Sequence, residues 1–154
     1  MLTESQVIAA VCRFLKKNGF RVTQHLSETQ HGRDIVAISL NGTQEITIEA
    51  KGETSSMAHT RRYGKPFNSG QVEDHVAKAL YCAARDASLD MLAGVAFPKN
   101  TAHVKCVQKI LPALKKLCIE VFWVRSDKSV EVEHVWKTWG TACMRQPLPK
   151  RGDK

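Results

Sequence analysis

The stretch RDIVAISLNGTQEITIEAK, residues 33–51, decides the fold because it holds two β-rich segments joined by a turn. Residues 33–40 are rich in Ile and Val, and Asn41-Gly42 behind them is the strongest short hairpin signal. In residues 43–51 apolar and polar side chains alternate with the period of two that is typical of a strand. We therefore predict a β-hairpin over these two segments.

The sequence on either side of the hairpin alternates between helical and strand patterns. Helices are expected over 3–18, 71–86 and 101–117, the last kinked or split by Pro112, and further strands over 20–27, 91–97, 118–124 and 129–134. A hairpin followed by strand–helix–strand crossovers implies a sheet that mixes parallel and antiparallel strands. The predicted fold class is α/β, with a central mixed sheet flanked by helices on both faces.

Composition limits the class of protein. The 154 residues suit one domain, which we place at 1–140, followed by a basic and loosely ordered tail at 141–154. No apolar run approaches the length of a membrane span and no secretory signal is visible, so we expect a cytoplasmic protein. The net charge of +8 favours nucleic acid as the partner. The five cysteines form no CxxC pair. Four of them sit in apolar contexts and are expected to be reduced, buried thiols, namely Cys12, Cys82, Cys106 and Cys118.

The hairpin brings three ionisable side chains together. Glu49 and Lys51 lie two residues apart on a strand and therefore point to the same face. With Asn41-Gly42 at the tip, paired positions have numbers that sum to about 83, so Asp34 lies opposite Glu49. Two neighbouring carboxylates repel each other unless a cation joins them, and oxygen ligands of this kind suit Mg²⁺ or Mn²⁺. The nearby lysine can orient the attacking water or offset charge on a phosphate.

This pattern resembles the PD-(D/E)XK nuclease superfamily, which includes restriction endonucleases and archaeal Holliday-junction resolvases. The resemblance covers roughly residues 3–97, and its motifs are Arg33-Asp34 and Ile48-Glu49-Ala50-Lys51. It implies a restriction-endonuclease-like fold and metal-dependent hydrolysis of phosphodiester bonds. Asp34, Glu49 and the carbonyl of Ala50 would hold the metal, and Lys51 would assist the attacking water. Arg33 stands where the motif's name has proline.

Two further catalytic residues are implied by the same resemblance. Glu4 matches an acidic residue that many members carry on the first helix, where it supports a metal-bound water. Gln71 resembles a polar residue that some branches place on the following helix. Each has a structural alternative, because acids favour a first helical turn and because Gln71 can close a capping box opened by Asn68.

Candidate contacts to nucleic acid lie on that second helix and in the long polar stretch 52–70. His75 and Lys78 share a helix face with Gln71. The polar stretch contributes Arg61, Arg62 and Lys65, with aromatic residues among them, a composition that suits phosphate contact and base stacking. The alternatives are a solvated helix face and a flexible insertion. Glu53 is interpreted either as an extra metal ligand or as a solvated side chain.

The function predicted from the sequence is a metal-dependent nuclease, with DNA favoured over RNA as the substrate. We expect no attached recognition domain, and this expectation is compatible with a partner protein that supplies targeting. A homodimer is also compatible with the predicted nuclease. Two rivals remain open at this point. One is a non-catalytic module of the same fold that binds nucleic acid or protein, and the other is an unrelated α/β protein whose ion pairs imitate the motif.

Overall fold

The structure, a computed structural model, describes residues 1–26, 32–55, 63–89 and 91–133. Its elements follow the predicted order. They are α1 (Glu4–Lys17), β1 (Phe20–His25), β2 (Ile35–Ser39), β3 (Glu45–Ala50), α2 (Ser69–Ser88), β4 (Leu92–Pro98), α3 (Thr101–Lys116), β5 (Ile119–Val124) and β6 (Val130–Glu133). The predicted tail, 141–154, lies outside the described residues.

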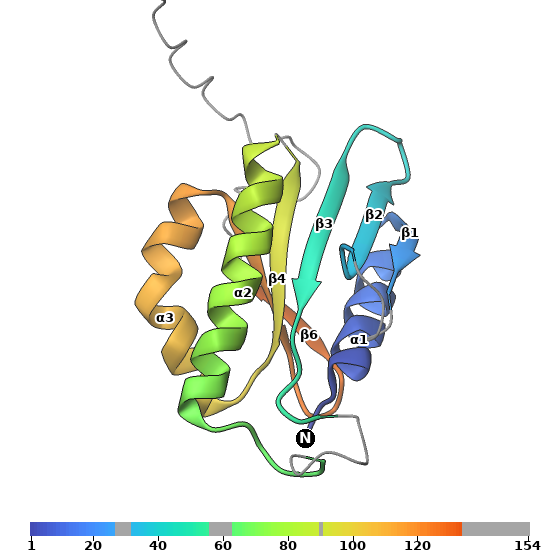
Figure 1. The fold of residues 1–154 in the computed structure, drawn as a ribbon. Coiled ribbons are helices and arrows are strands. Elements are labelled where there is room, and N and C mark those ends of the chain that lie inside the picture. The colour runs from blue at the N-terminus through green and yellow to red at the C-terminus, as the bar shows by residue number, and fades with distance from the viewer. Residues whose placement is uncertain (27–31, 56–62, 90, 134–154) are drawn as a thin grey trace, which may run out of the picture.

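The strands form one six-stranded sheet in which spatial order equals chain order, from β1 to β6. The β3–β4 and β4–β5 pairs are parallel, and the other pairs are antiparallel. Figure 1 shows α2 and α3 on one face of the sheet and α1 on the opposite face. The prediction of an α/β fold with a central mixed sheet and helices on both faces is confirmed.

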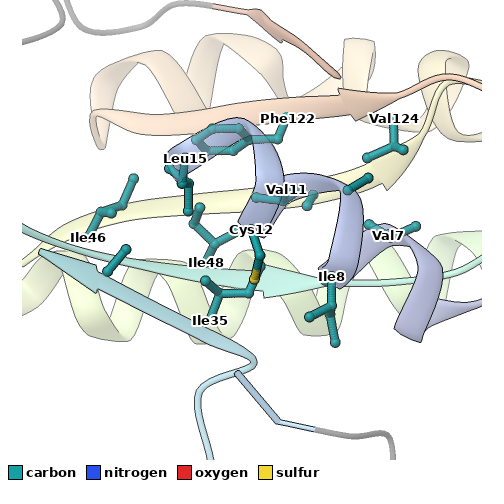
Figure 2. Packing of buried hydrophobic residues seen from close by; sticks show 14 of the residues in the cluster. Val7, Ile8, Val11, Cys12, Leu15, Ile35, Ile46, Ile48, Phe122 and Val124 are labelled. Atoms are coloured by element: carbon teal, nitrogen blue, oxygen red, sulfur yellow. The ribbon is translucent and has the colours of Figure 1, made fainter. Parts of the chain in front are cut away.

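Helix α1 covers its face of the sheet with the apolar stripe that the sequence predicted. Thr3 and Gln6 form a capping box at its start, and Gly19, with a φ of 81°, follows its end. In Figure 2 the stripe points at side chains from β2, β3 and β5. The buried residues labelled there are Val7, Ile8, Val11, Cys12, Leu15, Ile35, Ile46, Ile48, Phe122 and Val124.

Helices α2 and α3 enclose a second cluster on the other face. Its members from α2 recur at helical spacing, and they pack against β4 and β5. The buried residues are Val72, Val76, Ala79, Ala83, Ala93, Val95, Phe97, Val107, Leu114, Ile119, Val121 and Trp123. The odd-numbered positions of β3 face this side, because Ile46 and Ile48 belong to the α1 cluster. The side chain of Glu49 is thereby directed to the α2 face of the sheet.

The hairpin register agrees with the prediction, while its loop is longer than two residues. Ile35 pairs with Ile48, so paired numbers sum to 83. The strands end at Ser39 and Glu45, and in the loop the Asn41 carboxamide oxygen accepts hydrogen bonds from the Ser39 hydroxyl and from the Thr43 amide and hydroxyl. The Ser39 amide still donates to the Gln44 carbonyl oxygen at 2.8 Å, so the same register continues to the tip.

Other predictions need correction. Pro112 lies inside α3 without splitting it, at an exposed position where a lost backbone bond can be replaced by water. Among the described cysteines only Cys12 is buried, and Cys82, Cys106 and Cys118 are partly exposed, so the prediction of buried thiols was too broad. Within the described ranges, no helix is both long and apolar enough to cross a membrane.

Candidate active site

The paired acids lie where β2 begins and β3 ends. Asp34 immediately precedes β2, and its Oδ2 accepts a hydrogen bond of 2.8 Å from the backbone amide of Ala50. The side chains of Asp34 and Glu49 are only 13% and 14% exposed. The register that places Ile35 opposite Ile48 therefore also brings these two carboxylates together, as the sequence predicted.

The ammonium group of Lys51 lies among four oxygen atoms, which come from α1, from the start of β2 and from the end of β3. Its Nζ is 2.7 Å from Glu49 Oε1 and donates a 2.8 Å hydrogen bond to the Ala50 carbonyl oxygen. Two further carboxylate oxygens, Glu4 Oε2 at 3.5 Å and Asp34 Oδ2 at 3.7 Å, complete the set. The structure thus brings Glu4, Asp34, Glu49, Ala50 and Lys51 together, and we call these five residues the acid cluster.

Glu4 reaches the acid cluster because the chain leaving β3 runs against the start of α1. Gly52 lies so close to α1 that a Cβ atom there would be 2.5 Å from the backbone nitrogen of Glu4 and 2.8 Å from the carbonyl carbon of Thr3. Contacts this short with backbone atoms leave no room for any side chain larger than hydrogen. The glycine therefore sets the distance between the first turn of α1 and Lys51.

In the acid cluster, the pKa values of Glu49 and Lys51 are both raised, for different reasons. Burial raises the pKa of the Glu49 carboxyl, and the Lys51 ammonium only partly opposes this rise. Burial also lowers the pKa of Lys51, but the charges of Asp34, Glu4 and Glu49 outweigh it, so the net pKa of Lys51 is raised. Three carboxylates around one ammonium group leave an excess of negative charge when all are ionised.

The oxygens of the acid cluster suit a hard divalent cation, with one rearrangement. Carboxylate and carbonyl oxygens are the ligands that Mg²⁺ and Mn²⁺ prefer, and the excess negative charge has the sign that such an ion neutralises. Among the described residues, however, no three His, Cys, Asp or Glu side chains are already arranged to hold a metal ion. The Lys51 ammonium lies within 3.7 Å of these oxygens, so Lys51 must turn aside for a metal to bind there.

The predicted residues of α2 divide into two groups. Gln71 forms the capping box with Asn68, through its backbone amide and its side-chain oxygen, and so follows the structural alternative. His75 differs from Gln71 in that the charge of Lys51 in the acid cluster acts on it. Its pKa is lowered by burial and by the charges of Lys51 and Lys78, so a neutral His75 is expected at neutral pH. The His75 ring packs edge-on against Phe67, with ring centroids 4.6 Å apart.

Of the four lysine and arginine residues predicted to contact nucleic acid, two lie among the described residues. Lys65 and Lys78 are exposed, as a contact to a phosphate backbone requires. Arg61 and Arg62 lie outside the described residues. Glu53 is neither a solvated side chain nor a member of the acid cluster, because its carboxylate accepts hydrogen bonds from the Leu2 amide and the Asn100 side chain.

Sequence reasoning missed a group of residues on α2 that border the acid cluster. A small pocket is lined by Glu49 together with Cys82, Arg85 and Asp86. Arg85 is exposed, and its charge acts on Glu49. Asp86 is buried and forms an ion pair with Arg33. One signal was present in the sequence, since Asp86 continues the row of buried positions Val76, Ala79 and Ala83 along α2.

Comparisons with known proteins leave the family open. No protein-family model matches the chain, and no curated protein matches it. Among solved structures, that of SfsA from Pyrococcus furiosus in complex with Ca²⁺ is similar, with a TM-score of 0.40 and 11% identity. The similarity covers 81% of this chain and 58% of that chain, so this chain spans little more than half the length of that protein. At this TM-score the likeness supports no argument about function.

Proposed function

We propose that this chain is a metal-dependent nuclease that hydrolyses phosphodiester bonds, with DNA as the favoured substrate. One observation carries the proposal. Oxygens of Asp34, Glu49, Glu4 and the Ala50 carbonyl surround a single cationic group at distances of 2.7–3.7 Å. A cation is thus already favoured at this place, which is where the resemblance to the PD-(D/E)XK superfamily expects a metal.

Each residue of the acid cluster has a role in this proposal. Asp34, Glu49 and the Ala50 carbonyl would hold Mg²⁺ or Mn²⁺, and such an ion acidifies a bound water and neutralises phosphate charge. Lys51, once turned aside, would donate to a non-bridging oxygen of the phosphate and offset the charge that grows there. Glu4 would accept a hydrogen bond from the attacking water and orient it toward phosphorus. Hydrolysis would join the water oxygen to phosphorus and break one P–O ester bond, and a proton from water would end on the leaving alkoxide oxygen.

Cations around the acid cluster would hold the nucleic-acid backbone. Lys78 and Arg85 lie seven residues apart on α2 and are therefore on the same side of the helix, about 10 Å apart along its axis. Lys65 is a third exposed cation, on the segment between β3 and α2. Contacts of this kind recognise phosphate rather than base sequence. The neutral His75 would contribute a hydrogen bond rather than a charge.

The test is cleavage of supercoiled plasmid and of single-stranded DNA in the presence of Mn²⁺ or Mg²⁺. Wild type should cut only with the metal, and Asp34→Asn and Lys51→Ala should reduce cutting to background. Matched controls are Glu131→Gln and Lys16→Ala, which remove one acid and one base that are outside the acid cluster. Cutting that survives in either cluster variant would refute the proposal.

The same experiment separates the second candidate, a non-catalytic binding module. One observation favours that candidate, namely that Lys51 already neutralises part of the negative charge without any metal. Wild type that binds DNA but cuts neither substrate with either metal would support the binding module. Wild type that neither binds nor cuts would indicate ion pairs that imitate the motif.

A further inference from the structure

Asp86 is a buried carboxylate on the inner side of α2. It is 3% exposed and lies on the apolar row of the helix, where ionised acids are rare unless they are paired. Burial raises the pKa of its carboxyl, but hydrogen bonds from Arg33 and Thr47 lower this pKa by more than burial raises it. The pKa of Asp86 is therefore below its ordinary value. Asp86 is therefore ionised at neutral pH and held by its partners.

Besides the neighbouring Arg85, whose Nε is 3.4 Å from Oδ1, Asp86 has two partners, and these come from the two segments that carry the paired acids. Arg33 Nε donates to Oδ2 at 2.8 Å and Arg33 Nη2 donates to Oδ1 at 3.2 Å, which is a bidentate geometry. The hydroxyl of Thr47 donates to the same carboxylate. Arg33 is the residue before Asp34 on the way into β2. Thr47 is on β3, two residues before Glu49 and on the same face of the strand.

The backbone around Arg33 is fixed from a second side. The Gln24 side chain donates a 2.9 Å hydrogen bond to the carbonyl oxygen of Arg33, and the Leu26 amide donates one of 2.9 Å to the carbonyl oxygen of Asp34. These bonds hold the chain to β1, while Asp86 holds it to α2. The entry into β2 is thus tied to elements on both sides of Asp34.

We propose that Asp86, with Arg33 as its partner, is a positioning residue that holds Asp34 and Glu49 at the separation a shared metal ion requires. This inference rests on the proposed function. A bidentate pair between flat groups fixes direction as well as distance, which an apolar contact at the same place does not. Residues that orient metal ligands from behind typically change metal affinity by about 10–100-fold when they are replaced.

The experiment replaces the pair by apolar side chains, in the double variant Arg33→Met/Asp86→Leu. Apolar replacement of both partners often keeps stability where an ion pair is buried, and in this pair Asp86 is buried while Arg33 is half-buried, so the double variant separates positioning from folding. We expect a metal-free Tm close to that of wild type, and Mn²⁺ affinity, measured by titration calorimetry, that is lower by about 10–100-fold. The Mn²⁺ concentration for half-maximal DNA cleavage should rise by the same factor.

Two further variants keep the test decisive. Thr47→Val removes one hydrogen bond to Asp86 at nearly constant volume and should weaken Mn²⁺ binding by a smaller factor than the double variant does. If the double variant does not fold, Thr47→Val alone decides the question. The control is Arg125→Met/Glu131→Leu, which removes an exposed ion pair of the same chemistry at the opposite edge of the sheet and should leave Mn²⁺ affinity unchanged.

The outcomes distinguish the two proposals. Wild type that binds Mn²⁺, with a folded double variant that binds it equally well, overturns the positioning role and leaves the proposed function intact. Thr47→Val that binds Mn²⁺ as wild type does, when the double variant is unfolded, overturns it as well. Wild type that binds no Mn²⁺ removes the proposed function and this inference with it.

Discussion

Two clusters of charge in this molecule are opposite in composition and in setting. In the acid cluster, one ammonium group faces three carboxylates, and the side chain of Lys51 is 12% exposed. At the edge strand β6, one carboxylate, Glu131, faces two cations, Lys99 and Arg125, and all three side chains are at least 36% exposed. Water screens the exposed set and scarcely reaches the buried one, so an imbalance of charge has a cost only in the acid cluster.

The comparison gives a physical criterion for ranking groups of charges as candidates for function. Both clusters contain short contacts, so geometry alone would rank them equally. What distinguishes the acid cluster is burial together with an excess of one sign, which folding alone does not favour. Single substitutions in the two clusters should therefore have effects of very different size.

The largest expected effect is that of Lys51→Met. Without the ammonium group, three carboxylates remain in a poorly hydrated site, so the metal-free protein should lose about 3–5 kcal/mol of unfolding free energy. Mn²⁺ should restore part of this loss, because a divalent ion can take over the neutralisation. Urea unfolding with and without Mn²⁺ measures both effects. A metal-free stability equal to that of wild type would show that the buried cluster behaves like the exposed one.

Gly52→Ala should have the next largest effect. Its methyl group would collide with the backbone of Thr3 and Glu4, so we expect a loss of about 1–3 kcal/mol. Activity should fall as well, since α1 would carry Glu4 away from Lys51. Urea unfolding and a cleavage assay report the two effects, and Gly70→Ala, whose nearest neighbour is a side-chain oxygen at 3.5 Å, is the matched control.

Glu49→Gln should make the metal-free protein more stable at neutral pH while it abolishes activity. The pKa of Glu49 is raised by burial, so folding disfavours its charged form. In wild type, the protonated form of Glu49 is the one that folding favours. Its contribution to stability is complete below the ordinary pKa of 4.5 and is lost as pH rises through the raised pKa of the folded state. The amide lacks that loss, and the expected gain at pH 7 is roughly 0.5–1 kcal/mol.

Thermal unfolding between pH 4 and pH 8 measures this difference. The Tm of wild type should fall relative to that of Glu49→Gln as pH increases. Parallel curves for the two proteins would contradict the direction of the pKa shift.

The smallest expected effect is that of Glu131→Gln. Lys99 and Arg125 lose their shared partner, but both remain hydrated. The pKa of Glu131 is lowered by Lys99 and Arg125, yet solvent screens this exposed group, so Tm at pH 7 should not change measurably. A clear drop in Tm would remove the contrast with the acid cluster.

Much of the site was predictable because it depends on local pairing. Asn41-Gly42 sets the hairpin register, and the register alone brings Asp34 opposite Glu49. The period of two then places Lys51 with Glu49. These inferences span fewer than twenty residues and need no knowledge of how helices pack.

What could not be predicted depends on contacts between elements distant in the sequence. Arg33 and Asp86 are 53 positions apart, and their contact follows from how α2 crosses the sheet. The contacts of Glu53 were not predicted for the same reason. Strand alternation ends at Ala50, and the Glu53 carboxylate beyond it accepts hydrogen bonds from Leu2 and Asn100. Pattern arguments extend along an element and stop where it ends.

The position of Lys51 has a consequence for the order of events in the cell. Some small metal-binding domains stay unfolded until their ion arrives, because nothing else neutralises their ligands. Here the Lys51 ammonium already neutralises part of the charge of the carboxylates, so we expect folding to be complete at any magnesium concentration. Under the proposed function, an incoming ion would compete with a tethered ammonium group, and occupancy of the site would then stay sensitive to free metal after the fold has formed.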